Sequence, residues 1–441
     1  MNSEMFVELP LRQLFIRCAA PAVITSVFGV LYSVVDGVFV GRFLGEDALA
    51  AINLIMPVIM IVEAVSNMIA TGASVNISIL LGKQKREEAS RVFSFSVKFI
   101  VAFSCVIGIL GFFFAGPFIR LIAPGANAEA IRFGTEYLKV FAVFAPLIPV
   151  YFATDNYLRV CGKQKSSMII GILTQMINVI LDFILIAALH QGVKAAAISS
   201  SISIVFGSLV TLVLFRGKRM DVYYTKGSID LKQFFHIIAN GSSEFFSSIA
   251  ASIMSVIMNL FLLKYGGTIA VAAFSIVMYV DQVVGMISFG ITDSLQPAIS
   301  YCYGAGERDR MNAVFKLVRN VMIIISMGVF LLMFFAGPGV AGIFIKPGET
   351  ELTVMSRTAV KLFAFSYLSG WIDSCYSSYF TALDRPGRSF LAAVFGTLVF
   401  PVAFLFMLTP LWGLNGVWLM APASAAASGI VTLVLYRTLQ T

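Results

Sequence analysis

The chain has 441 residues, of which 59% are hydrophobic and 12% are charged, and its formal net charge is +8. Soluble proteins are roughly 45–50% apolar and about 25% charged, so this composition excludes a soluble globular protein and predicts a multi-pass membrane protein. A membrane enzyme would need a nucleophile–base pair or a metal cluster. The isolated His190 and His236 and the five scattered cysteines supply neither, so we expect no enzymatic activity.

A membrane-spanning helix needs about 20 mainly apolar residues. Charge clusters and Gly and Pro residues divide this chain into twelve such segments. They cover residues 12–40, 48–80, 92–117, 132–158, 166–189, 194–215, 232–263, 268–302, 313–336, 353–381, 388–409 and 414–436.

The distribution of basic residues predicts the orientation. If both termini and the even-numbered loops share one side, that side holds 21 of the 31 Lys and Arg residues. The positive-inside rule then places both termini in the cytoplasm, with the chain in the cytoplasmic membrane. The longest basic connection divides the chain, so we expect a six-helix bundle at 1–215, a cytoplasmic linker at 216–231 and a second six-helix bundle at 232–441.

The two halves repeat when the chain is shifted by 222 residues. Gly82 then falls on Gly304, and Leu44-Gly45 falls on Gly266-Gly267. Six is an even number of spans, so both halves cross the membrane in the same sense, and we expect a pseudo-twofold axis along the membrane normal. The shift places Met258 opposite Asp36 and Phe404 opposite Asp182, so these acids belong to the first half alone, which favours a functional role.

Asp36 lies deep in the first apolar segment, and Asp182 lies deep in the fifth. A charge at the bilayer centre costs about 3 kcal/mol on insertion scales, so such residues face a bundle interior or a water-filled cavity. Counted at about 1.5 Å per residue from the outer ends, both acids have similar depth, and Asn178 lies one turn before Asp182 on the same helical face. We interpret the acids as the halves of one cation site; the alternative is a hydrogen-bond network that only packs helices.

Several motifs, in order and spacing, resemble those of the multidrug and toxic compound extrusion (MATE) family over nearly the whole chain. They are Asp36-Gly37 with Gly41-Arg42-Phe43-Leu44-Gly45, Asn178…Asp182, Gly192-Val193-Lys194, and Gln296-Pro297 with Tyr301 and Gly304-Ala305. The loop Asp155-Asn156-Tyr157-Leu158-Arg159 looks most like the MepA-type branch of the family.

The resemblance implies an all-α membrane fold of two six-helix bundles around a V-shaped central cavity. It also implies a site for a coupling ion, H⁺ or Na⁺, together with a proline that lets the first helix bend and a tyrosine near the site. The site residues are Asp36, Asn178, Asp182 and Ser200, supported by Pro21 and Tyr32. Hard oxygen ligands such as Asp36 and Asp182 suit a proton or an alkali cation such as Na⁺.

Further acids lie inside the apolar segments. Glu244 and Asp373 lie near mid-membrane, where they are candidates for binding a cationic substrate or a second proton; the alternatives are a water-exposed wall or a buried pair with a hydroxyl. Asp281 and Asp293 are about 18 Å apart along one helix, so the two of them cannot share one site. Glu63 has no nameable partner.

Two local features complete the candidates. Asp155 lies one turn before Arg159, which favours a local ion pair. Because aromatic faces attract organic cations, four aromatic residues are substrate-site candidates. They are Tyr137, Tyr151, Trp371 and Tyr376.

We therefore predict a secondary active exporter, monomeric in the bilayer, that moves cationic amphipathic organic compounds against H⁺ or Na⁺. We expect no cofactor and no nucleic-acid partner. The alternative is a flippase for a lipid-linked saccharide, a related kind of transporter. Such a protein would line its cavity with cationic side chains for a pyrophosphate, whereas the charged residues deep inside the apolar segments of this chain are nearly all acidic.

Overall fold

The computed structural model describes residues 2–44, 46–122, 128–217, 219–337, 339, 342, 345 and 349–440. Nearly all of them are helical, and no strand occurs in these ranges. Gly45, which belongs to the repeat and to one motif, lies outside the described residues. The chain forms two compact units, one of Met1–Gly241 with Ser300–Glu307 and one of Ser242–Ile299 with Arg308–Thr441.

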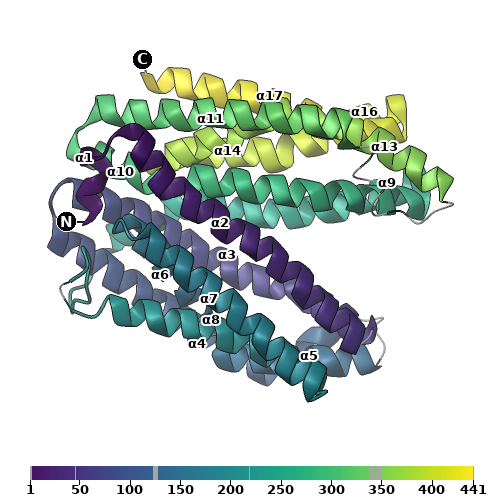
Figure 1. Cartoon of the computed structure of the whole chain (residues 1–441), viewed down its shortest axis with the longest axis horizontal. Helices are drawn as coiled ribbons and strands as arrows, with labels where there is room; N and C mark the ends of the chain where they lie inside the picture. The colour runs from purple at the N-terminus through teal and green to yellow at the C-terminus, as the bar shows by residue number, and fades with distance from the viewer. Residues whose placement is uncertain are drawn as a thin grey trace. The chain divides into compact units, whose positions relative to one another are not determined.

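The first unit contains the helices up to α8 and both ends of the stretch Leu231–Ala305, which we call the long helical stretch. Its elements are η1 (Asn2–Glu4), α1 (Met5–Glu8), α2 (Leu11–Phe39), the π-helical η2 (Val40–Leu44), α3 (Glu46–Gly82), α4 (Arg86–Ile122), α5 (Ala128–Phe144), α6 (Ile148–Val160), α7 (Gln164–Asp182), the π-helical η3 (Phe183–Ala188) and α8 (Gly192–Leu214). Within this unit α2 lies along α7 (Figure 1).

The second unit contains most of α9 and the helices from α11 onward. The elements are α9 (Leu231–Ser294), α10 (Gln296–Ala305), α11 (Arg308–Phe335), α13 (Thr350–Ala364), α14 (Tyr367–Ala382), α15 (Pro386–Val394), the π-helical η4 (Phe395–Val399), α16 (Phe400–Trp412) and α17 (Leu414–Gln440). The first residues of α9 and the last residues of α10 belong to the first unit.

Helices cover all twelve expected spans. By length and hydropathy, nine helices of the described residues could cross a membrane, or ten when α5 and α6, bent by 50°, count as one span. The remaining two expected spans are not counted separately by this criterion. Gly267 has φ 64° and ψ −160°, so it separates the segments expected at 232–263 and 268–302. The segment expected at 353–381 is α13 with α14, which are each too short to qualify alone.

Each unit has its own apolar core. In the first unit, Ile52 and Ile55 of α3 pack with Ile119 at the end of α4, Phe141 at the end of α5 and Ile186 of η3. In the second unit, residues of α9, α13, α16 and α17 form the corresponding core, with Trp418 fully buried at its centre. The core of the first unit surrounds the end of α7, which carries Asp182.

Glycines let α3 approach the long helical stretch closely within the first unit. A Cβ on Gly82 would lie 2.2 Å from the Tyr301 carbonyl oxygen, and a Cβ on Gly304 would lie 2.2 Å from the Ile79 carbonyl oxygen. Small residues allow this kind of backbone contact between membrane helices. The two glycines that the 222-residue repeat aligns therefore lie at one helix crossing.

The segment between α8 and α9 is fastened to the first unit. Arg86 donates to the Met220 carbonyl oxygen at 2.5 Å, and the Thr225 backbone N–H donates to Ser94 Oγ at 2.8 Å. Asp221 is buried and accepts hydrogen bonds from the chain's beginning, with the Ser3 N–H at 2.7 Å from Oδ2. The expected division at 216–231 stays a prediction.

Candidate functional site

Asp36 is carried by a helix that is loosely packed on its unit. Only 6% of the residues in the most apolar stretch of α2 are buried. Pro21 lies inside α2 and has no N–H, so the helix lacks one backbone hydrogen bond there. The Thr25 hydroxyl donates to the Pro21 carbonyl oxygen at 2.9 Å. These features allow α2 to bend at Pro21, on the N-terminal side of Asp36, with little loss of packing contacts.

Asp182 is held by side chains of α7 and α8. It is fully buried, and the Ser199 hydroxyl donates to its Oδ1. The Asn178 amide is oriented so that its nitrogen donates to Asp182 Oδ2 at 2.7 Å, while its oxygen accepts from Ser200 Oγ at 3.1 Å. Asn178 and Asp182 meet because they are four residues apart on one helical face. The π-helical η3 begins directly after Asp182, a geometry that is frequent at functional sites.

The two acids meet. The Asp36 and Asp182 carboxyls lie within hydrogen-bonding reach of each other, and Tyr32 lies beside Ser200. Two carboxylates without a proton have no donor between them, so the pair forms a hydrogen bond only when it holds one proton. The structure thus brings together Asp36, Asn178, Asp182, Ser200 and Tyr32, whereas Pro21 lies farther along α2.

Tyr137 and Glu63 lie near the pair. Tyr137 is buried in the core of the first unit, and Asp36, Asp182 and Glu63 are all close enough to act on its hydroxyl electrostatically. Glu63 therefore has surroundings that sequence reasoning does not name. Ser199 is also missed, because the only signal is the run Ser199-Ser200-Ser201, and spacing alone does not say which hydroxyl faces Asp182.

A second acidic site lies wholly within the second unit. Glu244 and Asp293 of α9 and Asp373 of α14 line a cavity of about 480 Å³. The Thr432 hydroxyl donates to Asp373 Oδ1 at 2.5 Å. Serine and threonine hydroxyls and a few apolar side chains complete the lining; among them are Ser247, Met254, Phe289, Thr292, Ser377, Met420 and Ser424. This cavity has the polar and apolar surfaces that an amphipathic cation needs.

Three candidates of the second half do not line this cavity. Asp281 lies close to Tyr367, so Asp281 and Asp293 have different surroundings, as their separation predicts. Tyr376 is buried and packs edge-on against Tyr436, with ring centroids 4.9 Å apart. The Trp371 indole N–H donates to the Leu368 carbonyl oxygen at 3.0 Å.

The candidates Tyr151, Asp155 and Arg159 lie on α6, which packs against α7. The predicted ion pair between Asp155 and Arg159 is confirmed. Ser167 of α7 donates to the other oxygen, Asp155 Oδ1, at 2.5 Å. Tyr151 lies one turn before Asp155 on α6 and faces Thr174 of α7. Tyr151 is therefore about two helical turns away from the carboxyl pair, on the other side of Asn178.

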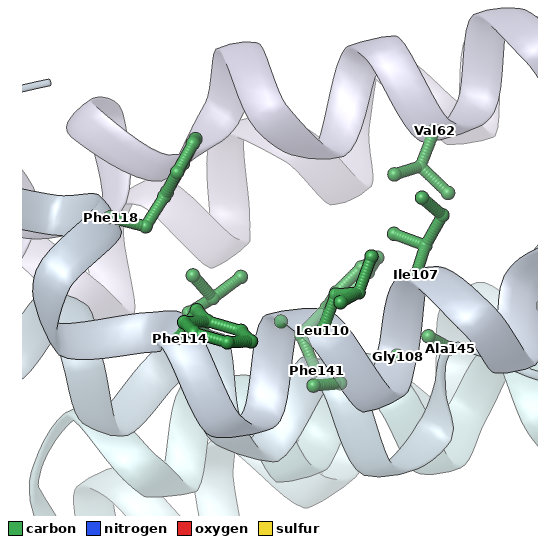
Figure 2. A pocket seen from close by; sticks show the side chains of 11 residues that line it. Val62, Ile107, Gly108, Leu110, Phe114, Phe118, Phe141 and Ala145 are labelled. Atoms are coloured by element: carbon green, nitrogen blue, oxygen red, sulfur yellow. The ribbon is translucent and has the colours of Figure 1, made fainter. Parts of the chain in front are cut away.

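An apolar cavity of about 190 Å³ also lies in the first unit, between α3, α4 and α5. Figure 2 shows Val62 and Ile107 facing each other across it, with Leu110, Phe114 and Phe141 along its length. No polar side chain lines it, so this cavity offers no ligand for an ion.

Comparisons with known proteins agree with this geometry. The MatE family model matches residues 21–184 and 245–407. Multidrug export protein MepA of Staphylococcus saprophyticus is 27% identical over 425 residues, 95% of this chain and 92% of that protein. MepA of Staphylococcus aureus (strain MSSA476) is 27% identical over 440 residues, 98% and 95% of the two chains. A crystal structure of MATE in the bent conformation, 23% identical, covers 100% of both chains with a TM-score of 0.88 and shows the same fold. The chain is a multi-pass membrane protein and belongs to the MatE family.

Proposed function

We propose that the chain is a secondary active multidrug exporter that moves cationic amphipathic organic compounds out of the cell in exchange for H⁺ or Na⁺. The observation that carries the proposal is the close approach of the Asp36 carboxyl to the fully buried Asp182 carboxyl. The name of the MepA relatives, multidrug export protein, supports the class of activity.

The carboxyl pair can exist in two forms. With one proton it forms a hydrogen bond between the two carboxyls. Without the proton, Asp36 and Asp182 repel each other unless a cation lies between them, and the Asn178 and Ser200 oxygens add hard ligands for Na⁺. Two unit charges 4 Å apart repel by about 4 kcal/mol at an effective dielectric constant of about 20.

This repulsion acts between two helices, because Asp36 is on α2 and Asp182 is on α7. Moving a two-state equilibrium from 1:99 to 99:1 takes about 5.5 kcal/mol, so the repulsion is of the right size to drive a conformational change. The sparse packing of α2 and the missing backbone hydrogen bond at Pro21 favour α2 as the helix that moves. The pair then acts as the ion-operated switch of the exporter.

The acidic cavity of the second unit is the proposed substrate site. Glu244, Asp293 and Asp373 attract a cation, while Met254 and Phe289 contact its apolar part. A flippase that binds an anionic pyrophosphate would be repelled by the same three acids. The acidic lining therefore favours the exporter over the flippase.

We further propose that both termini and the segment at 216–231 face the cytoplasm, that the domains divide at this segment, and that the protein acts as a monomer. The excess of Lys and Arg on the side of the termini supports the orientation. No further chain is needed to complete either acidic site, since each is formed within one unit.

The proposal is tested with purified protein in proteoliposomes loaded with a fluorescent organic cation, with pH and Na⁺ gradients imposed separately. We expect substrate movement driven by at least one of the two gradients and abolished by a protonophore or a Na⁺ ionophore accordingly. No movement with either gradient, together with movement of a lipid-linked saccharide, would favour the flippase.

A further inference from the structure

The buried face of α7 is polar along its whole length, which is unusual for a membrane helix. Its buried residues are Gln164, Ser167, Ile170, Gly171, Thr174, Asn178 and Asp182. Apart from Ile170, they lie within an arc of roughly 80° and extend over about 27 Å. The opposite face is apolar and exposed, with Ile169, Leu173, Met176 and Ile180. Neutral polar residues inside a membrane bundle hydrogen-bond across helices, and an ionisable residue such as Asp182 there marks a functional site.

Hydrogen bonds connect the two ends of this face to ionisable groups. At one end, Asn178 donates to Asp182 Oδ2 at 2.7 Å. At the other end, Ser167 donates to Asp155 Oδ1 at 2.5 Å, and Arg159 pairs with the other oxygen of Asp155. The Arg159 side chain is 24% exposed, so the lower end reaches the surface of the unit.

Along this face, two glutamine oxygens are buried without a hydrogen bond among the described residues: Gln175 Oε1 between the two ends, and Gln164 Oε1 one turn before Ser167. Thr174, also between the ends, faces the Tyr151 hydroxyl. Buried polar atoms nearly always bond to protein or to ordered water, so the two glutamine oxygens indicate positions that water occupies. A single water bridges two oxygens that are roughly 5–6 Å apart, which matches the rise of one helical turn between Thr174 and Asn178.

The longer gap, from Thr174 to Ser167, contains the hydroxyl of Tyr151. A Cβ on Gly171 would lie 3.4 Å from Tyr151 Oη, and a Cβ on Gly207 would lie 2.7 Å from both Thr174 Oγ1 and the Tyr151 ring. The absence of a side chain at Gly171 and Gly207 thus leaves the Tyr151 hydroxyl and Thr174 in reach of each other and of water.

We infer that the polar face of α7 is a proton path that joins the Asp36–Asp182 pair to the Asp155–Arg159 pair. The inference rests on the proposed exporter function, in which a proton bound at the pair must leave on the cytoplasmic side. A proton leaves the carboxylic acid, and each water or hydroxyl accepts one proton and passes on its own. A carboxylate remains at the pair, and one proton enters the water beside Asp155.

Among the described residues, the acids and the Arg along this path lie at its ends, while the Tyr151 hydroxyl lies midway and the Cys18 thiol of α2 contacts Gln164. Asp36 of α2, Glu63 of α3 and Tyr137 of α5 surround the upper end. At the lower end are Asp155 and Arg159 of α6. Between them α7 contributes only neutral groups that can both donate and accept, or hold a water that does so. This arrangement carries a proton without trapping it midway.

The first experiment is transport by full-length Thr174→Val in proteoliposomes. Valine keeps the shape of threonine but removes the hydroxyl. We expect the ratio of pH-driven net efflux to substrate–substrate exchange, which moves no net proton, to fall by roughly tenfold, as for one lost hydrogen bond on the path. Thr174→Ser returns the hydroxyl and should recover the ratio. Thr135→Val is the control, since this hydroxyl bonds only within α5, to the Ile131 carbonyl oxygen at 2.7 Å.

An unchanged ratio in Thr174→Val would overturn the path, and so would an equal fall in both Thr174 variants, because that indicates packing alone. A second readout does not depend on transport. Hydroxyl radicals made from bound water by X-ray pulses should modify Tyr151 faster than Tyr157, which is fully buried and donates to Ser96 Oγ at 2.8 Å. This excess should diminish in Thr174→Val.

If wild-type protein shows no pH-driven efflux, the proposed proton coupling fails, and the radical labelling then decides the path by itself. Labelling of Tyr151 that exceeds Tyr157 and depends on Thr174 supports a water-filled route in the first unit. Labelling that is equal for the two tyrosines, or that is independent of Thr174, overturns it.

Discussion

The close approach of the Asp36 and Asp182 carboxyls makes the protonation of one acid depend on the other. The pair is surrounded by donors, since Ser199 and Asn178 each donate to Asp182. These donors fix the orientation of the Asp182 carboxyl. Because Asp36 is carried by α2, a change in the charge of the pair acts on the loosely packed helix.

Asp36→Asn tests this arrangement. Asparagine has the same shape and can still donate to Asp182, so the fold should be kept, with a change in stability of about 1 kcal/mol or less. Gradient-driven efflux should fall by roughly 100-fold, measured in proteoliposomes. Asp309→Asn, at an exposed acid in the first turn of α11, should transport normally. Wild-type efflux in Asp36→Asn would remove Asp36 from the mechanism.

Glu244→Gln and Asp373→Asn test the second acidic site. Both residues line the cavity of the second unit, so neutralising each should weaken the binding of cationic substrates by up to about 1 kcal/mol, while the binding of neutral compounds is affected less. The measurement is the substrate profile and the ion stoichiometry, with Asp182→Asn in parallel. Loss of ion coupling in either variant, with Asp182→Asn still coupled, would show that the roles of the two halves are reversed.

At the scale of helices, the crossing of α3 with α10 depends on glycine. The backbones are so close at Gly82 and Gly304 that each lacks room for a methyl group. The same is true where α3 meets α9, because a Cβ on Gly72 would lie 2.0 Å from the Ile237 carbonyl oxygen. α3 is thus joined to the long helical stretch at two points.

Gly82→Ala should therefore destabilise the protein by about 1–3 kcal/mol through overpacking, which is measured as a lower Tm in detergent. Gly328→Ala is the matched control. Nothing lies within 4 Å of a Cβ at Gly328 of α11, so alanine should be neutral or stabilise by about 0.8–1 kcal/mol through helix propensity. Equal Tm values for the two variants would contradict the close crossing.

The helices and one half of the cation site are predictable from the sequence, because they depend on local patterns. Apolar length marks the spans, and the spacing of Asn178 and Asp182 places both on one face. The choice of Ser199 as the partner of Asp182 and the position of Glu63 near Tyr137 depend on helix rotation and packing, which no local pattern encodes. Tyr376 illustrates the same limit, since aromatic composition does not distinguish a cavity wall from a buried aromatic cluster.

At the scale of the whole molecule, the segment between α8 and α9 is a fixed surface feature of the first unit. It is held by Arg86, Ser90 and Ser94 of the α4 side. Its exposed positions, such as Lys226, are available to a reagent from the side of the membrane on which the segment lies.

Lys226→Cys tests the orientation. An impermeant thiol reagent should label residue 226 in inside-out vesicles but not from outside intact cells. Cys161, between α6 and α7, provides an internal reference: burial raises the pKa of its thiol to about 12, so almost no thiolate is present near pH 7 and labelling there is slow. Modification of residue 226 from outside intact cells would reverse the proposed topology.

The docking of the chain's beginning has a consequence for biosynthesis. Ser3 bonds to Asp221, and the Phe6 ring lies 5.7 Å from the Tyr301 ring. Ribosomes add about 5–20 residues per second, so roughly 15–60 s pass between the synthesis of Phe6 and that of Tyr301. During this interval the surface that receives Phe6 does not yet exist. The first residues to be translated are thus among the last to reach their final position, and a fusion partner placed before them would be present at the step that completes the unit.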